Sequence, residues 1–206
     1  MGRATEGTSS AVTDALWLDT LHRICARAAH ELKGALNGVA VNLEVVRSRA
    51  EKPDVPASKV SKFANAAVDQ LGAVITMTEA LLVLSRPMRE PVELGSLVVR
   101  VGDLVVPAAR ADGRRVTFEG EYGDLGVTSA SGSAACLAVG WCLLAAVDAS
   151  SSVRCSAVLG ESEPGIRIEM HDGDAPPIDP EIAAATADAG IRIVAESSAI
   201  SITFPR

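Results

Sequence analysis

Two stretches of helical apolar periodicity, separated by a pair of prolines, constrain the fold of this chain more than any other feature. The first stretch starts near Asp14 and continues for about 35 residues, and the second covers residues 57–85. Pro53 and Pro56 predict a loop between them, and Pro87 ends the second stretch because proline cannot continue a helix. The first stretch has its three-four spacing at Leu18, Leu21, Cys25, Ala28, Leu32, Ala35, Val39 and Val46.

Two long helices joined by a short loop form an antiparallel hairpin. A single hairpin leaves half of its apolar surface in water, whereas two hairpins can share that surface in a four-helix bundle. We therefore predict a homodimer built on a helical hairpin that spans residues 13–88. Residues 1–12 are small and polar, and we predict a disordered tail there.

Short strands and helices alternate over residues 89–206. The predicted elements are a short strand and a helix over 92–106, a strand over 115–119, an apolar helix over 134–149, strands over 153–159 and 165–171, and a terminal hairpin of 191–195 with 200–204. This mixture predicts the α+β class, with a small α/β sandwich beside the helical bundle.

Charge and apolar content exclude several classes of protein. The net charge is -7 and the sequence has no run of Lys or Arg, so we expect no nucleic-acid partner. There is no apolar signal region at Met1 and no uninterrupted apolar run of the roughly 18 residues that span a membrane. The cysteines form no C-x-x-C pair, so we expect reduced core thiols in a cytoplasmic protein that does not contact a membrane.

His30 is the candidate for chemistry. At about 100° per residue, Ala28 and Leu32 share the core face and His30 points about 180° away from their midpoint, into solvent. An exposed imidazole is a competent nucleophile near neutral pH. Glu31 can orient or deprotonate the ring, and Lys33 can attract an incoming phosphoryl group. Spacing alone is also compatible with His30 as an ordinary surface residue.

The other histidines have simpler interpretations. His22 is expected to be a solvated helix residue, and His171 to follow a strand. A metal site at His171, Asp172 and Asp174 has only one histidine and close spacing, so no metal is expected there.

Residues 30–33 resemble the H-box of sensor histidine kinases, where the phosphoacceptor histidine is followed by Glu-Leu-Arg or a close variant. Five further segments resemble features of the same family in the same order. They are 79–86 at the close of the dimerisation hairpin, 91–94 at the start of the catalytic domain, 143–150 in the N-box helix, 166–173 at the strand ending in the first glycine box, and 200–205 in the last strand. The resemblance covers roughly residues 14–206 and implies a dimeric hairpin joined to an ATPase-like domain.

The chain departs from this family at the nucleotide site. Two N-box asparagines hold Mg²⁺ and phosphates in the family, whereas Trp141 and Ala145 stand here and neither offers the oxygen donors that Mg²⁺ requires. The first glycine box reads Asp-x-Gly-x-Gly in the family, whereas its positions are occupied here by His171, Gly173 and Ala175, with Asp172 one residue out of register. The second glycine box and the lid are missing, so backbone phosphate binding is not expected.

A histidine-bearing hairpin joined to a degenerate ATPase-like domain resembles the dimeric histidine phosphotransferases of bacterial phosphorelays. The resemblance implies that His30 accepts a phosphoryl group from one receiver domain of a response regulator and passes it to another. No cofactor is expected in this chain, because the receiver supplies the Mg²⁺. Gly34 stands where many family members have Thr or Asn, so strong phosphatase activity is not expected. The alternatives are a non-catalytic dimeric interaction module and an ATP-dependent kinase with an unusual site.

Overall fold

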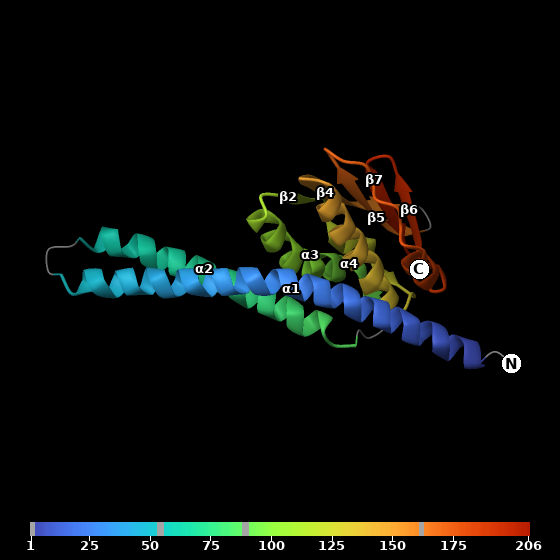
Figure 1. The fold of residues 1–206 in the computed structure, drawn as a ribbon, viewed down its shortest axis with the longest axis horizontal. Coiled ribbons are helices and arrows are strands. Elements are labelled where there is room, and N and C mark those ends of the chain that lie inside the picture. The colour runs from blue at the N-terminus through green and yellow to red at the C-terminus, as the bar shows by residue number, and fades with distance from the viewer. Residues whose placement is uncertain (1–2, 53–55, 88–90, 161–162) are drawn as a thin grey trace.

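Two antiparallel helices, α1 (Arg3–Ala50) and α2 (Ala57–Leu84), form a long hairpin that extends beyond the rest of the molecule (Figure 1). The computed structural model describes residues 3–52, 56–87, 91–160 and 163–206, with side chains from Ser10 onward. The predicted hairpin is therefore present, while Pro53 and the predicted boundary at residues 88 and 89 lie wholly or partly outside the described residues.

The first helix starts ten residues earlier than predicted. α1 begins at Arg3, so the expected disordered tail over residues 1–12 is wrong for residues 3–12. The physical reason lies in the residues that directly follow this segment. Thr13 and Trp17 are buried, and α1 contacts α4 and α5. This packing stabilises the helix there, and propagation adds each residue before it at little cost.

The α/β part begins with a two-residue strand, as the sequence predicts. Its helices are α3 (Leu94–Ala111), α4 (Gly132–Ala149) and α5 (Pro180–Ala187), with a 3-10 turn at Tyr122–Leu125. Its strands are β1 (Val92–Glu93), β2 (Arg115–Glu119), β3 (Val127–Thr128), β4 (Ser152–Leu159), β5 (Pro164–Met170), β6 (Arg192–Glu196) and β7 (Ala199–Thr203). β1 pairs with β3, and the remaining strands form one sheet in the order β2-β4-β5-β7-β6.

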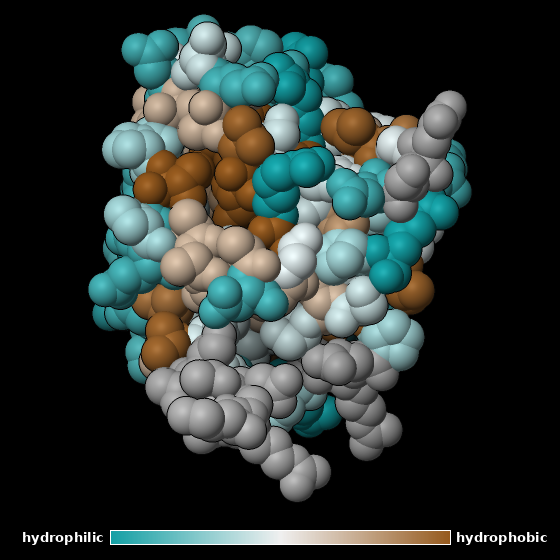
Figure 2. Space-filling model, turned by 90° about the vertical axis from the view of Figure 1, so that its right-hand side faces the viewer, coloured by the Kyte–Doolittle hydropathy of each residue, from teal (hydrophilic) through white to brown (hydrophobic). Residues whose placement is uncertain are grey.

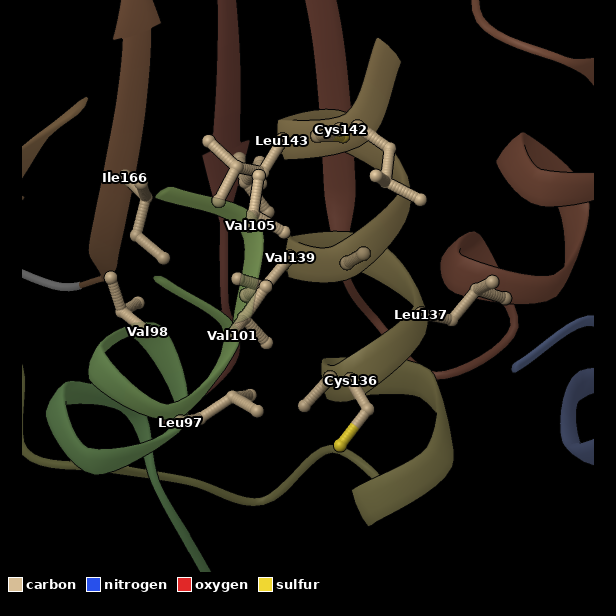
Figure 3. Close-up of a cluster of buried hydrophobic side chains, with 14 of the residues drawn as sticks. Leu97, Val98, Val101, Val105, Cys136, Leu137, Val139, Cys142, Leu143 and Ile166 are labelled. Atoms are coloured by element: carbon tan, nitrogen blue, oxygen red, sulfur yellow. The ribbon is translucent and has the colours of Figure 1, made fainter. Parts of the chain in front are cut away.

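One face of the five-stranded sheet carries the core. β2 and β4 are parallel, and the other neighbours are antiparallel, including the predicted terminal hairpin of β6 and β7. Figure 3 shows how side chains of α3 and α4 meet there, with Val98 and Val101 of α3 near Ile166 of β5. The opposite face is polar, because Arg154, Arg167 and Glu169 alternate with the buried strand residues.

The hairpin and the α/β part share one continuous core. Trp17, Ile24 and Ala28 of α1, with Met77 and Leu84 of α2, belong to the same buried cluster as the side chains of α3 and α4. Gly140 of α4 permits a close approach, because a Cβ there would lie 3.1 Å from the Trp17 ring and 3.3 Å from the Ile24 Cδ1. The two predicted domains are therefore packed against each other along the first half of α1.

Large apolar side chains remain exposed along the hairpin. They are Leu36, Val41 and Leu43 of α1 and Val68, Leu71, Ile75 and Leu82 of α2. Figure 2 views the molecule from the end at which α1 starts, and apolar residues also gather in a patch on this face.

Among the residues that the structure describes, two helices, α2 and α4, are long and apolar enough to cross a membrane by length and composition alone. For α4 the reason is its place in the core, because 72% of its most apolar window is buried. The corresponding window of α2 is 22% buried, and its exposed residues are those of the hairpin surface described above.

Candidate functional site around His30

His30 lies on the exposed side of α1, as its helical position predicts. Ala28, two residues earlier, is fully buried, while His30 is exposed to solvent. The backbone is held by helical hydrogen bonds on both sides, so the ring is presented by a rigid element. His22, two turns earlier on the same helix, is exposed as well.

The two predicted helpers of His30 occupy different faces of α1. Lys33 is exposed and about 60° around the helix from His30, whereas Glu31 is half-buried and about 100° away. Within the described residues, neither side chain forms a hydrogen bond or ion pair with His30. The roles predicted for Glu31 and Lys33 therefore stay predictions.

Asp148, in the last turn of α4, binds α1 just before His30. Its carboxylate accepts a hydrogen bond of 2.7 Å from Arg27 Nη2 and lies 3.5 Å from Arg23 Nη2. Arg27 is three residues before His30, which is about one helical turn. The contact thus joins the end of α4 to α1 about one helical turn before the exposed histidine. Sequence reasoning missed it, because the partners are 121 residues apart and both look like ordinary surface charges.

Apolar residues occupy much of the region that the resemblance assigns to nucleotide binding. Trp141 and Ala175 pack against the core cluster, and Ala145 is half-buried. Gly173 lies directly against the Ala149 carbonyl, where any Cβ would collide with the oxygen. A phosphate or a hydrated Mg²⁺ finds no oxygen donor in the Trp141 or Ala145 side chain.

Asp172 is fully occupied with a structural role. Its carboxylate accepts hydrogen bonds from the hydroxyls of Ser150 and Ser151 and from the Ser151 backbone N–H at 2.9 Å. The Ser150 and Ser151 hydroxyls hold the pKa of this carboxyl at about 2, below its usual 3.8. Asp172 therefore ties the end of β5 to the segment between α4 and β4, and it is not free to replace the missing aspartate of the glycine box.

The segment from His171 to Gly190 contains a helix that the sequence analysis did not predict. Asp179 caps α5 by accepting a hydrogen bond of 2.8 Å from the Glu181 N–H, and Pro180 occupies the first helical position. Ile182 and Ala185 are buried, and α5 contacts both α4 and α1. The Asp-Pro pair followed by alanines was a usable helix signal. α5 stands in the part of the chain where the resemblance implies a lid and a glycine-rich loop.

Metal and thiol chemistry have little support among the described residues. They contain no group of three or more His, Cys, Asp or Glu side chains arranged to hold a metal ion. The four cysteines, all within the described residues, form no disulfide bond, and Cys136, Cys142 and Cys155 are buried. Burial raises the pKa of Cys136 to about 12 and that of Cys155 to about 11, which suppresses their reactive thiolate forms.

Comparisons with known proteins give little additional information. No protein-family model matches the chain, and no curated protein matches it. Among solved structures, the chain is similar to the Acinetobacter baumannii histidine kinase AdeS, with 12% identity, a TM-score of 0.41, and coverage of 85% of this chain and 97% of that chain.

Proposed function

We propose that the protein is a cytoplasmic histidine phosphotransferase of a two-component phosphorelay, which accepts and donates a phosphoryl group through His30 without binding ATP. The observation that carries the proposal is the exposed position of His30 one helical turn from the Arg27–Asp148 contact. A receiver docked there meets the nucleophile on α1 and an adjoining surface at the end of α4. The H-box-like sequence of residues 30–33 supports the same assignment.

The proposed step is an in-line displacement at phosphorus. The unprotonated ring nitrogen of His30 attacks the aspartyl phosphate of a receiver. A bond from nitrogen to phosphorus forms as the bond from phosphorus to the aspartate oxygen breaks, and the aspartate leaves as a carboxylate. The proton on the other ring nitrogen passes to water or to a carboxylate such as Glu31. The receiver supplies the Mg²⁺, and Lys33 adds positive charge on the same side of α1.

The proposal that ATP is not the donor is supported by the former nucleotide region. Trp141 and Ala145 replace oxygen donors, and the Asp172 carboxylate is held by two serines. α5 stands in place of a glycine-rich loop. The arrangement of Trp141, Ala145, Asp172 and α5 fits a domain that docks a partner better than one that hydrolyses ATP.

Dimerisation is part of the proposal. Leu36 and Leu43 share one side of α1, and Val68, Leu71, Ile75 and Leu82 share one side of α2, whereas Val41 lies on another side of α1. Residues seven apart lie within about 20° of each other on a helix. A second hairpin would cover these residues in a four-helix bundle. The same contact explains why α2 is so apolar yet exposed.

The test is transfer of label from receiver domains charged with acetyl [³²P]phosphate. The proposal predicts acid-labile, alkali-stable label on this protein without added ATP, and its return to a second receiver. The interaction-module alternative predicts receiver binding without label. The kinase alternative predicts label from Mg·ATP alone and saturable stabilisation of the fold by Mg·ATP. Either of the last two outcomes contradicts the proposal.

A further inference from the structure

A pocket of about 410 Å³ opens between α2, α3 and β2, and neither His30 nor Trp141, Ala145 or Asp172 lines it. Ala73 and Met77 of α2 form one wall, Val99 and Asp103 of α3 form another, and the rings of Phe118 and Tyr122 complete it. The lining is predominantly apolar and includes one carboxylate, that of Asp103. Sites for small organic molecules commonly have this composition.

The aromatic part of the pocket is held in place by packing. The Phe118 and Tyr122 rings meet edge to face with centroids 5.9 Å apart. The Tyr122 hydroxyl donates a hydrogen bond of 2.7 Å to the Cys155 carbonyl. Phe118 lies against Gly102, where a Cβ would be 2.8 Å from the ring. The rings are therefore fixed before any ligand arrives.

Asp103 has an incomplete set of partners. Its Oδ2 lies 3.7 Å from Arg100 Nη1, which is longer than a hydrogen bond, and its side chain is 23% exposed. Within the described part of the chain, this carboxylate accepts no hydrogen bond. Burial raises the pKa of Asp103, Arg100 lowers it, and the Glu79 carboxylate raises it further. A cationic donor in the pocket would satisfy the carboxylate and offset the cost of its burial.

We propose that this pocket binds a small amphiphilic amine, with its ammonium group on Asp103 and its hydrocarbon body between Met77, Val99 and the Phe118 ring. Charge complementarity selects the amine, because Asp103 is the carboxylate of the lining, its ion pair with Arg100 is long at 3.7 Å, and the nearby Glu79 carboxylate adds negative charge. Both the hairpin and the α/β part supply walls, so the ligand stabilises their packing against each other. The site is independent of the phosphotransfer proposed for His30.

Methionine methyl NMR tests this site directly. Met77 lines the pocket, whereas Met170 is buried in β5 and serves as an internal control. Octylamine, 1-octanol and octanoate are titrated below their aggregation limits. The proposal predicts a saturable shift of the Met77 methyl, an unmoved Met170 methyl, and binding of octylamine at least about tenfold tighter than 1-octanol. An unmoved Met77 signal, or equal binding of all three probes, overturns the proposal.

Two variants and one control test whether the amine binds in this pocket and whether Asp103 selects it. Asp103→Asn keeps the shape of the side chain and should abolish the preference for octylamine, while Asp69→Asn on the exposed side of α2 should leave it intact. Ala73→Phe fills the pocket and should remove binding of every probe. If Asp103→Asn perturbs the Met170 signal, Ala73→Phe decides the outcome alone. Retained octylamine binding in Ala73→Phe places the ligand elsewhere and contradicts the assignment.

Discussion

Arg27 of α1 and Asp148 of α4 are joined by a hydrogen bond of 2.7 Å, three residues before His30 on the same helix. The two side chains are 34% and 41% exposed, so the contact contributes little to stability. The contact marks where the end of α4, which is held by the core that it shares with α1, meets α1 about one helical turn before His30. A receiver that approaches His30 therefore meets both parts of the molecule.

The first prediction concerns this contact. In a double-mutant cycle of Arg27→Ala and Asp148→Ala, we expect a coupling free energy of about 0.2–1 kcal/mol, measured by urea unfolding. Both single variants should slow label transfer to His30, because the docked surface is less well fixed. Asp69→Ala is the control for loss of an exposed carboxylate. Normal rates of label transfer in both variants would show that the end of α4 takes no part in receiver docking.

The second prediction concerns Gly34, one turn after His30. Apart from the adjoining residues and the nearby backbone of the helix itself, no heavy atom lies within 4 Å of the position that a Cβ would occupy, and the same is true of Gly72 on α2. Gly34→Ala and Gly72→Ala should each stabilise the fold by up to about 1 kcal/mol in urea unfolding, because alanine favours helix. Only Gly34→Ala should slow transfer from a receiver, since it adds bulk beside the imidazole. Equal transfer in both variants would show that a receiver needs no space at residue 34.

The third prediction concerns the proposed dimer. Sedimentation equilibrium should give twice the chain mass of 21.2 kDa for the wild type. Ile75→Glu introduces a charge on the exposed apolar side of α2 and should shift the protein toward monomer, whereas Leu159→Glu at the end of β4 should not. A monomeric wild type, or a dimer that tolerates Ile75→Glu, contradicts the bundle.

The fourth prediction concerns the pH dependence that Asp172 imparts. Hydrogen bonds from Ser150 and Ser151 lower its pKa from 3.8 to about 2, so the ionised form is favoured in the folded state. Its contribution to stability is present above about pH 4 and is lost as the pH falls toward 2. Asp172→Ala should therefore unfold more easily at pH 7 and show a smaller stability loss across this window. Asp174→Ala is the matched control, and an identical acid profile for Asp172→Ala and wild type would contradict the assignment.

The four longer helices and the terminal hairpin could be predicted from the sequence because their signals are local, whereas the short helix α5 was missed. Pro56 and Pro87 bound α2, and the alternation in residues 191–204 predicts β6 and β7. The start of α1 could not be predicted, since residues 3–12 form a helix only because the adjoining turn packs against distant elements. The two-residue strand β3 could not be predicted either. Two residues carry no recognisable pattern, and β3 forms because it pairs with β1.

The candidate site also has features that the sequence predicts and features that only the fold reveals. The exposure of His30 follows from its helical phase relative to Ala28. The contact of Arg27 with Asp148, the engagement of Asp172 by Ser150, and the pocket around Asp103 all depend on residues brought together from separate elements. Periodicity carries no information on such pairs, because each of these polar residues looks like solvated surface when its own segment is considered alone.

The most direct measurement compares His30→Gln with His22→Gln in label transfer from a phosphorylated receiver. Both histidines are exposed on α1 two turns apart, and both substitutions should leave the fold unchanged. The account predicts that His22→Gln is labelled like the wild type and that His30→Gln takes up no label while still binding the receiver. Undiminished label in His30→Gln, or equal loss in both variants, would contradict the assignment of His30 as the phosphoryl acceptor.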